Sequence, residues 1–307
     1  MGNPLISIAV PVYNGEQTVD AAVASCVNQD ANEHYEVLLV DNCSNDGTVE
    51  IFEKYTNHPN VRLLVNRETV SVYDNHNICL QEASGKYVVF CHADDTLEKH
   101  ALRTFSKRLR DRGCPEKYVL WGRSMYRDYF KYLRNAGESL NQLIVGEVAP
   151  LIFMNSGLAP SGCCYSRVSF LEHGGFLVPQ NRLAPSDMVT MLSLAVNGFR
   201  FEMFDEMVLG RTFASTAVSG LSVSTLLDAM DEAIDLFISA TDESTVERLI
   251  HLCVGNRIHA YSFLHALARY KRYKRAVRKA VIKSVLEHPA HMRIEIFRRL
   301  AYRAFSS

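Results

Sequence analysis

Three features that would assign this chain of 307 residues to a common class are missing from it. No apolar run reaches the roughly 18 residues of a membrane span, because the best candidate, residues 143–154, is interrupted by Glu147 and Pro150. The eight cysteines include no Cys-x-x-Cys pair, which favours reduced thiols in a cytoplasmic protein over a zinc site or a disulfide framework. Neither Gly-x-Gly-x-x-Gly nor a Walker loop follows the first predicted strand, so the usual glycine-lined phosphate sites are excluded.

The chain as a whole also lacks an excess of either charge, although its parts are strongly charged. The formal net charge is −1. Residues 269–303 contain twelve Lys or Arg and two acids, a local balance of +10, which leaves −11 for the rest of the chain. We therefore expect the two regions to meet different partners. The apolar content of 48% and the charged content of 22% are those of an ordinary globular protein.

Predicted strands and helices alternate over the first 125 residues. The strands are expected at residues 5–12, 36–40, 61–65, 87–91 and 118–121. The helices are expected at residues 16–28, from 46 onwards, 73–83 and 97–110. This alternation predicts βαβ units in an α/β, Rossmann-like fold, with a mostly parallel twisted sheet flanked by helices. We expect a ligand-binding domain at residues 1–215 and a C-terminal helical appendage at 216–307, which is basic from about residue 269.

Acidic residues follow the predicted strands at the edge where open α/β sheets bind their ligands. Asp41 ends the second strand, and His92, Asp94 and Asp95 follow the fourth. The carboxyl ends of parallel strands share one edge, so these side chains can converge. Carboxylates of this kind suit Mg²⁺ or Mn²⁺, which in turn can carry a diphosphate. The alternative is that Asp94 and Asp95 cap a helix that starts near residue 97.

Six short segments occur in a fixed order: PVYNGE at residues 11–16, VDNCSNDGT at 40–48, VYDNHN at 72–77, ADD at 93–95, GGF at 174–176 and SD at 186–187. Together they resemble the successive motifs of family 2 glycosyltransferases, which have the GT-A fold. Residues 72–77 resemble the I-Y-D-A-M-N segment of a branch often found in bacterial polysaccharide and O-antigen synthesis. The resemblance covers roughly residues 5–215. It implies that a sugar is transferred from a nucleotide donor, usually UDP-linked, with inversion at the anomeric carbon.

A nucleotide site at the strand ends is also implied by the resemblance. Asp41 would accept the imide N–H of uracil, which cytosine lacks; alternatively it caps a turn. Asp74 would hold the nucleotide or orient Asp94, and the alternative is an N-cap. Asn77 would belong to the same site, or be solvated on its helix. The implied nucleotide-binding residues are Pro11, Val12, Tyr13, Asn14, Glu16, Asp41, Asp74, Asn77, His92 and Ala93.

The resemblance further implies a divalent metal, Mn²⁺ or Mg²⁺, at Asp94, with Asp95 orienting it or contacting the donor sugar. The family pattern is Asp-x-Asp, and this chain has His92 in the first position, where the similar branch often has Asn. This substitution removes one negative charge. His92 could contact the ribose or the diphosphate, or ligate a transition metal through a neutral imidazole. The alternative is a structural histidine.

Asp187 is implied to be the catalytic base. Inversion requires a carboxylate on the face opposite the leaving UDP, within reach of the acceptor hydroxyl. Ser186 stands where the family usually has another acid. The alternative is that Asp187 caps the apolar helix that it opens.

The C-terminal region is predicted to form amphipathic helices with basic faces. One apolar stripe has a spacing of four residues, and Lys or Arg residues flank it; the stripe is Tyr273, Val277, Val281 and Val285. Such helices suit an anionic membrane surface. The alternative is a solvated face that packs on the ligand-binding domain or on a second subunit of a homodimer. No nucleic-acid recognition motif accompanies the charge, so nucleic acid is not expected as a partner.

These observations predict an inverting, metal-dependent glycosyltransferase at the cytoplasmic face of the membrane. It would add one sugar to a saccharide or lipid-linked acceptor. Two alternatives are a sugar-phosphate nucleotidyltransferase and a non-catalytic nucleotide-sugar-binding scaffold. The first would need a glycine-rich loop with a basic residue near the first strand, which is absent. The prediction depends on Asp41, Asp94 and Asp187 lying around one cleft.

Overall fold

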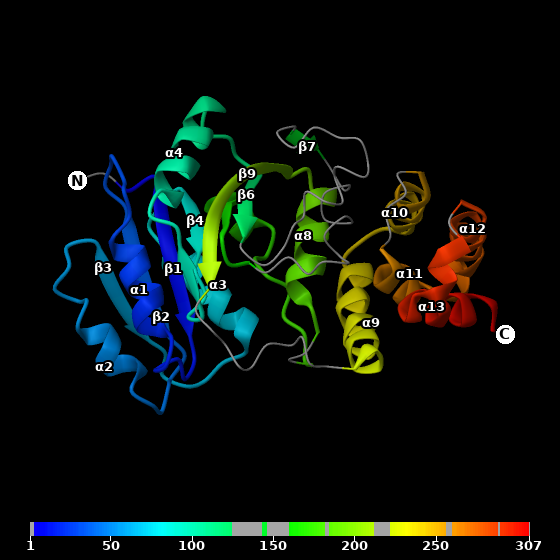
Figure 1. Cartoon of the computed structure of the whole chain (residues 1–307), viewed down its shortest axis with the longest axis horizontal. Helices are drawn as coiled ribbons and strands as arrows, with labels where there is room; N and C mark the ends of the chain where they lie inside the picture. Colours follow the sequence, from blue (N-terminus) through cyan, green and yellow to red (C-terminus); the bar gives the residue numbers. More distant parts are fainter. Residues whose placement is uncertain are drawn as a thin grey trace.

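The computed structural model describes residues 3–124, 143–145, 160–181, 184–211, 222–255, 260–287 and 289–306. One mixed sheet lies at the centre of the N-terminal part, and a group of helices lies at the other end of the long axis (Figure 1). Within the described ranges, no helix combines the length and the apolar content that crossing a membrane requires.

Four parallel strands form the first half of the sheet, in the order β3-β2-β1-β4. They are β1 (Ile6–Val12), β2 (Glu36–Asp41), β3 (Val61–Val65) and β4 (Tyr87–Phe90). The helices that connect them are α1 (Val19–Val27), α2 (Thr48–Glu53) and α3 (Val72–Glu82). The predicted βαβ units are therefore confirmed, and the carboxyl ends of the four strands share one edge.

The second half of the sheet differs from a simple continuation of these units. β8 (Cys163–Ser166) lies between β4 and β6 (Tyr118–Ser124) and is antiparallel to both. β9 (Arg200–Arg211) runs parallel to β6, and the short strands β5 (Asp95–Leu97) and β7 (Leu143–Val145) pair with it in antiparallel register. The helix expected from residue 97 begins later, as α4 (Ala101–Asp111), because residues 95–97 pair with β9.

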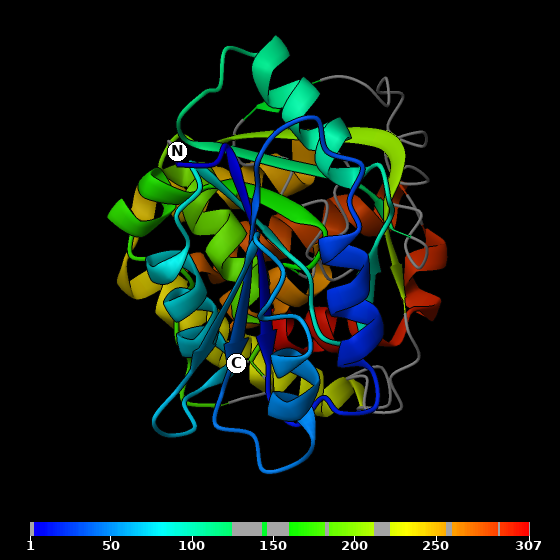
Figure 2. The same cartoon turned by 90° about the vertical axis from the view of Figure 1, so that its left-hand side faces the viewer.

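Alternate side chains of the central strands enter two separate cores. Val88 and Phe90 face α3, α7 (Arg167–Glu172) and α8 (Ser186–Val196). Tyr87, Val89 and Cys91 face α1, α2 and α4. This two-residue period places helices on both faces of the sheet, as Figure 2 shows for α1 and α3 on opposite sides of the strands.

The C-terminal helices share a third core. They are α9 (Val223–Ser239), α10 (Glu243–Gly255), α11 (Tyr261–Leu267), α12 (Lys271–Glu287), the 3₁₀ helix η2 (Pro289–Arg293) and α13 (Glu295–Phe305). Val189 and Leu192 of α8 enter this core, whereas Met191 and Leu194 of the same helix enter the core of the sheet. Helix α8 is therefore sandwiched between the two parts of the molecule (Figure 1). The expected boundary near residue 215 falls outside the described residues.

Truncating the α8 side chain that faces the C-terminal helices should destabilise the protein strongly. Leu192 is fully buried, so Leu192→Ala leaves a cavity and should lower the free energy of unfolding by about 2–5 kcal/mol. Urea denaturation followed by circular dichroism measures this change. Leu286→Ala is the matched control because Leu286 is 77% exposed. Equal effects of the two substitutions on the free energy of unfolding would contradict the burial of α8 against the C-terminal helices.

Candidate active site

Two loops at the carboxyl edge of the sheet are tied to each other by their own side chains. The N–H of Asn14 donates to Ser44 Oγ, and the N–H of Asn45 donates back to Asn14 Oδ1, both at 2.9 Å. The N–H of Gly47 donates to Glu16 Oε2, also at 2.9 Å. Asn14 and Glu16 therefore hold the loop after β1 against the loop after β2. Tyr13, directly before Asn14, is 52% exposed, so its ring is accessible to a planar ligand.

Asp41 has one satisfied and one unsatisfied carboxylate oxygen. It ends β2 and is fully buried. Oδ2 accepts the N–H of Ser44 at 2.9 Å, which is the turn-capping bond considered as the alternative. Oδ1 is buried without any hydrogen-bond partner among the described residues. A buried unsatisfied acceptor costs about 1–3 kcal/mol, so Oδ1 is suited to accept an N–H from a ligand.

An asparagine network that the sequence reasoning missed fixes the loop before α3. Asn42 Nδ2 donates to the carbonyl of Val70, and the N–H of Val70 donates to Asn42 Oδ1, each at 2.9 Å. Asn66 Nδ2 bridges Asn42 Oδ1 and Asn75 Oδ1 at 3.0 and 2.9 Å. Each asparagine follows a strand or lies in a first helical turn, a pattern that by itself indicates only a turn.

Asp74 and Asn77, the predicted nucleotide contacts on α3, both have partners within the protein. Ser71, not Asp74, is the N-cap of α3, and its hydroxyl donates to Asp74 Oδ2 at 2.6 Å. Asn77 Nδ2 donates to the carbonyl of Phe176, and the N–H of Phe176 donates to Asn77 Oδ1, at 2.9 and 2.7 Å. Asn77 therefore holds the GGF turn (residues 174–176) on α3, and the alternative of a solvated amide is wrong.

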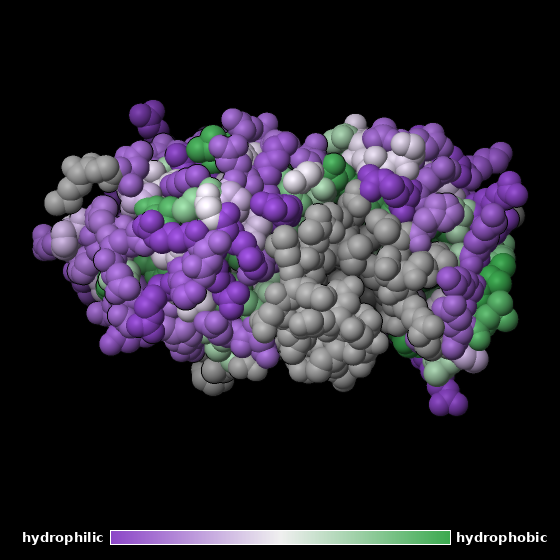
Figure 3. Space-filling view, turned by 90° about the horizontal axis from the view of Figure 1, so that it is seen from above, coloured by the Kyte–Doolittle hydropathy of each residue, from purple (hydrophilic) through white to green (hydrophobic). Residues whose placement is uncertain are grey.

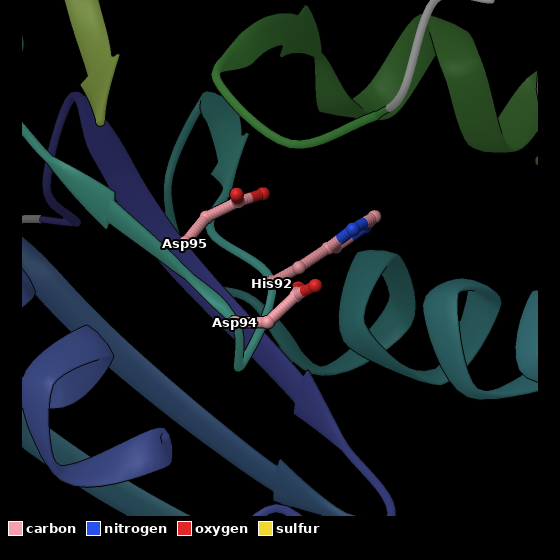
Figure 4. Close-up of side chains that lie close together, drawn as sticks. All are labelled: His92, Asp94 and Asp95. Carbon is pink, nitrogen blue, oxygen red and sulfur yellow. The ribbon is translucent and has the colours of Figure 1, made fainter. Parts of the chain in front are cut away.

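His92, Asp94 and Asp95 form a candidate metal-binding cluster after β4. One ligand atom from each lies within 4.8 Å of the others, and all three side chains are half-buried (Figure 4). The N–H of His92 donates to Ser161 Oγ at 3.0 Å. Because α4 begins only at residue 101, the alternative that the two acids cap a helix near residue 97 is wrong. Two carboxylates and an imidazole are a donor set that fits Mn²⁺ and other divalent ions.

A second histidine, missed by the sequence reasoning, lies behind the cluster. His76 Nε2 is 2.9 Å from His92 Nε2, and His76 Nδ1 is 2.7 Å from the carbonyl of Val72. Burial, followed by the effect of His92, lowers the pKa of His76 to about 3. Burial also lowers the pKa of His92, although the carboxylates of Asp95 and Asp94 oppose that shift. Both imidazoles are therefore neutral near pH 7.

Asp187 lies in the first turn of α8 and contacts α3. Tyr73 Oη donates to Asp187 Oδ1 and accepts the N–H of Asp187, both at 3.3 Å. Burial, together with the neighbouring Asp187, raises the pKa of Tyr73, so its hydroxyl stays protonated. The N-cap of α8 is Pro185, so the alternative that Asp187 is the cap is wrong. Ser186 is buried, and its hydroxyl donates to the carbonyl of Leu177.

Helix α3 connects Asp187 to the metal cluster. Tyr73, which contacts Asp187, and His76, which contacts His92, are one helical turn apart, with ring centroids separated by 6.1 Å. Asp41 ends β2 at the same edge of the sheet from which the cluster follows β4. The arrangement offers an acceptor for a base N–H, ligands for a cation and a carboxylate on a separate helix.

Comparison with known proteins finds a matching family model and a shared fold. Residues 7–134 match the model of glycosyl transferase family 2. The structure of Staphylococcus aureus TarS residues 1–349 in complex with UDP-GlcNAc has a TM-score of 0.65 at 17% identity, covering 99% of this chain and 90% of that one. The mannosyltransferase PcManGT of Pyrobaculum calidifontis in complex with GDP-Man and Mn²⁺ has a TM-score of 0.60 at 17% identity, covering 98% and 84%. The fold is therefore that of GT-A glycosyltransferases.

Curated relatives match over parts of their length. The uncharacterized protein MT1568 of Mycobacterium tuberculosis is 29% identical over 62% of this chain and 62% of its own length. The putative teichuronic acid biosynthesis glycosyltransferase TuaG of Bacillus subtilis is 25% identical over 64% and 74%. TarS, a poly(ribitol-phosphate) β-N-acetylglucosaminyltransferase, is 33% identical over 32% of this chain but only 17% of its own length. Over residues 7–134 the chain is therefore similar to the family 2 glycosyltransferases.

The GGF turn provides a test of the contact between α3 and the loop before α8. A Cβ on Gly175 would lie 2.3 Å from Asn77 Oδ1, whereas a Cβ on Gly174 would meet nothing within 4 Å. Both glycines have a positive φ, 70° at Gly175 and 88° at Gly174, so alanine is strained at either position. Gly175→Ala should therefore lower the free energy of unfolding by about 1–3 kcal/mol more than Gly174→Ala, because only the former is overpacked. Urea denaturation of the two variants measures this difference. Equal losses in the free energy of unfolding would contradict the contact with Asn77.

Proposed function

We propose that this chain transfers a sugar from a UDP-sugar to a hydroxyl of a saccharide or lipid-linked acceptor, with inversion, in the synthesis of a cell-surface polysaccharide. The single observation that carries the proposal is the connection through α3 between Asp187 and the cluster of His92, Asp94 and Asp95. A donor and an acceptor must meet between a metal and a base, and this connection brings the two sets of groups together.

Asp41 is the proposed reader of the nucleotide base. Its buried, unpartnered Oδ1 would accept the imide N–H of uracil, while Oδ2 remains on Ser44. The backbone from Pro11 to Val12 would frame the base, and the exposed ring of Tyr13 would stack on it. Asn14 and Glu16 act here by holding the two loops that form this pocket. Complexes of structural neighbours with UDP-GlcNAc and with GDP-Man support a nucleotide-sugar donor.

Asp94 is the proposed metal ligand, and Asp95 would orient the metal or contact the donor sugar. A divalent ion bound there would neutralise the charge that develops on the leaving diphosphate. Asp74, in the first turn of α3, would help to position the nucleotide. The Mn²⁺ in the complex of the Pyrobaculum mannosyltransferase supports a divalent ion, without selecting between Mn²⁺ and Mg²⁺ for this chain.

Asp187 is the proposed general base. Its Oδ1 accepts from Tyr73, which fixes the direction of the carboxylate. Deprotonation of the acceptor hydroxyl by such a group contributes roughly 10²- to 10⁴-fold to the rate. Attack by the deprotonated oxygen on the face opposite the leaving UDP inverts the anomeric centre.

Turnover of UDP-sugars separates this proposal from a non-catalytic scaffold. Purified protein with Mn²⁺ should release UDP slowly from a UDP-sugar and faster when the acceptor is present. Asp94→Ala should abolish both reactions. Asp187→Asn should lower transfer by at least about 100-fold while UDP binding measured by calorimetry is kept. Asp111→Asn, on the exposed end of α4, is the matched control and should have wild-type activity.

If the chain is a scaffold, the wild type should bind UDP, and neither it nor any of the variants should release UDP from a UDP-sugar. A nucleotidyltransferase would instead form a nucleotide sugar from a sugar phosphate and a nucleoside triphosphate.

Replacing Asp41 should change which nucleotide base the protein prefers. Asp41→Asn presents an amide N–H₂ to the base if its oxygen stays on Ser44, and this group repels the uracil N–H but suits the cytosine N3 acceptor. Loss of a charge-assisted hydrogen bond should weaken UDP binding about 10- to 100-fold, while CDP binding changes less. Isothermal titration with UDP and CDP measures both. A uniform loss for the two nucleotides would mean that Asp41 does not read the base.

The C-terminal helices are proposed to touch an anionic membrane through an apolar patch. This C-terminal apolar patch comprises Ile282, Leu286, Met292 and Ile294, which are 49%, 77%, 44% and 41% exposed. It lies on α12, on η2 and on the N-cap residue of α13. Helix α12 and η2 contact each other, and hydrophobic residues are visible at this end of the molecule (Figure 3). Exposed basic residues lie on the same elements: Arg275, Lys279, Arg293 and Lys283, which pairs with Glu287.

Several further basic residues of this region are paired with acids. Arg269 and Arg303 pair with Asp231 of α9, and Arg299 pairs with Glu295. The pairs of Arg269 and Arg303 help to hold α13 and the end of α11 on α9, whereas the Arg299 pair lies within α13, so only part of the basic excess is available to a membrane. Each available Lys or Arg contributes about 1 kcal/mol near an anionic surface.

Vesicle sedimentation tests the membrane proposal. The wild type should bind vesicles rich in phosphatidylglycerol, bind phosphatidylcholine vesicles weakly, and lose binding at high salt. Leu286→Asp should reduce binding at least about tenfold because it removes buried apolar area and adds a negative charge. Val168→Asp, an equally drastic change at an exposed position on α7, is the control. Salt-independent dimerisation that Leu286→Asp abolishes would assign the patch to a second copy of the chain instead.

A further inference from the structure

Two departures from the family pattern lie in direct contact. His92 occupies the position where the similar branch often has Asn, and His76 occupies the position of Met in the similar I-Y-D-A-M-N segment. The two residues are 16 positions apart, yet their Nε2 atoms are separated by 2.9 Å. Because these two departures from the family pattern contact each other, we expect them to share one role. His76 is neither a member of the metal-binding cluster nor the proposed base, so its role has to be found elsewhere.

The partners of His76 determine where the protons are. His76 Nδ1 lies 2.7 Å from the carbonyl of Val72, which can only accept, so Nδ1 carries the proton. The ring is buried against Phe90 and Phe176, where a second ring proton would place a charge in an apolar core, so its Nε2 has a lone pair. The bond between the two histidines therefore requires His92 Nε2 to be the donor. His92 Nδ1 is then unprotonated, with its lone pair available to a cation.

Packing keeps this arrangement fixed. His76 is stacked on Phe90, with ring centroids 5.1 Å apart, and meets the edge of Phe176 at 5.4 Å. Phe176 in turn is tied to α3 through Asn77. His92 is held from the other side by the bond from its backbone N–H to Ser161. The His76 imidazole therefore cannot rotate without disturbing its packing against Phe90 and Phe176.

We propose that His76 is a positioning residue that fixes the tautomer of His92, so that His92 Nδ1 completes a nitrogen-containing site for a divalent transition metal together with Asp94 and Asp95. An imidazole ligand favours Mn²⁺ and the later transition metals over Mg²⁺, which prefers oxygen. The pair of histidines thus shifts the ion preference of the site away from Mg²⁺. The inference rests on the proposed metal site but not on the identity of the sugar donor.

Direct binding of Mn²⁺ tests the inference without any substrate. Mn²⁺ alone is titrated into the purified chain and followed by electron paramagnetic resonance, and electron spin echo modulation then reports a nitrogen bound to the ion. The wild type should show one coupled ¹⁴N and should bind Mn²⁺ more tightly than Mg²⁺ in competition. His92→Asn should lose the ¹⁴N signal and most of the preference for Mn²⁺.

Variants of His76 isolate its positioning role. His76→Met should weaken Mn²⁺ binding about 10- to 100-fold, as is typical for the partner of a metal-bound histidine. His76→Gln should restore much of the affinity, because its amide oxygen can accept from His92 Nε2. His173→Met is the matched control: His173 Nδ1 also lies 2.7 Å from a carbonyl four residues earlier, but its ring packs against Phe199.

The outcomes are distinguishable from failure of the proposed transfer reaction. Absence of Mn²⁺ binding, absence of ¹⁴N coupling in the wild type, or wild-type affinity in a folded His76→Met protein would each overturn the inference. Thermal unfolding establishes that the variants are folded. Release of UDP from a UDP-sugar is measured separately, so a chain that binds Mn²⁺ through nitrogen but turns over no donor would contradict the proposed function alone.

Discussion

The contacts made by the first two turns of α3 are the constraint on which the candidate site depends. Tyr73 reaches Asp187 on α8, His76 reaches His92 after β4, and Asn77 holds the GGF turn that leads to α8. Three segments that are far apart in the sequence are therefore positioned by one helix. The asparagine network fixes the start of that helix relative to β2, so the site is built on packed elements whose side chains have little freedom to move.

Polar groups at the carboxyl edge of the sheet are satisfied by one another, with one informative exception. The loops after β1 and β2 exchange hydrogen bonds through Asn14 and Glu16, and Asn42 satisfies the loop before α3. Against this background the buried Oδ1 of Asp41 has no partner among the described residues. Burying an acceptor in this way is costly unless a ligand supplies the donor. The proposed contact with a base N–H would supply the donor that this oxygen lacks.

Helix α8 links the site to the C-terminal helices because it contributes to two cores. Leu194 packs towards the sheet and Leu192 towards α9–α13, while Asp187 at its start faces Tyr73. Helix α8 thus joins the proposed base to the core of the C-terminal helices.

Local patterns in the sequence determined the β3-β2-β1-β4 half of the sheet and the placement of Asp41, Asp94 and Asp95 after strands, because alternation of strand and helix fixes which edge the strand ends share. They could not place β8 between β4 and β6, since strand pairing over long separations leaves no periodic signal. Nor could they assign Tyr73 or His76, whose residue types fit an ordinary helix surface, or show that Asn77 bonds to the GGF turn. Only tertiary packing, which brings residues 16 to 114 positions apart within hydrogen-bond distance, decided these contacts.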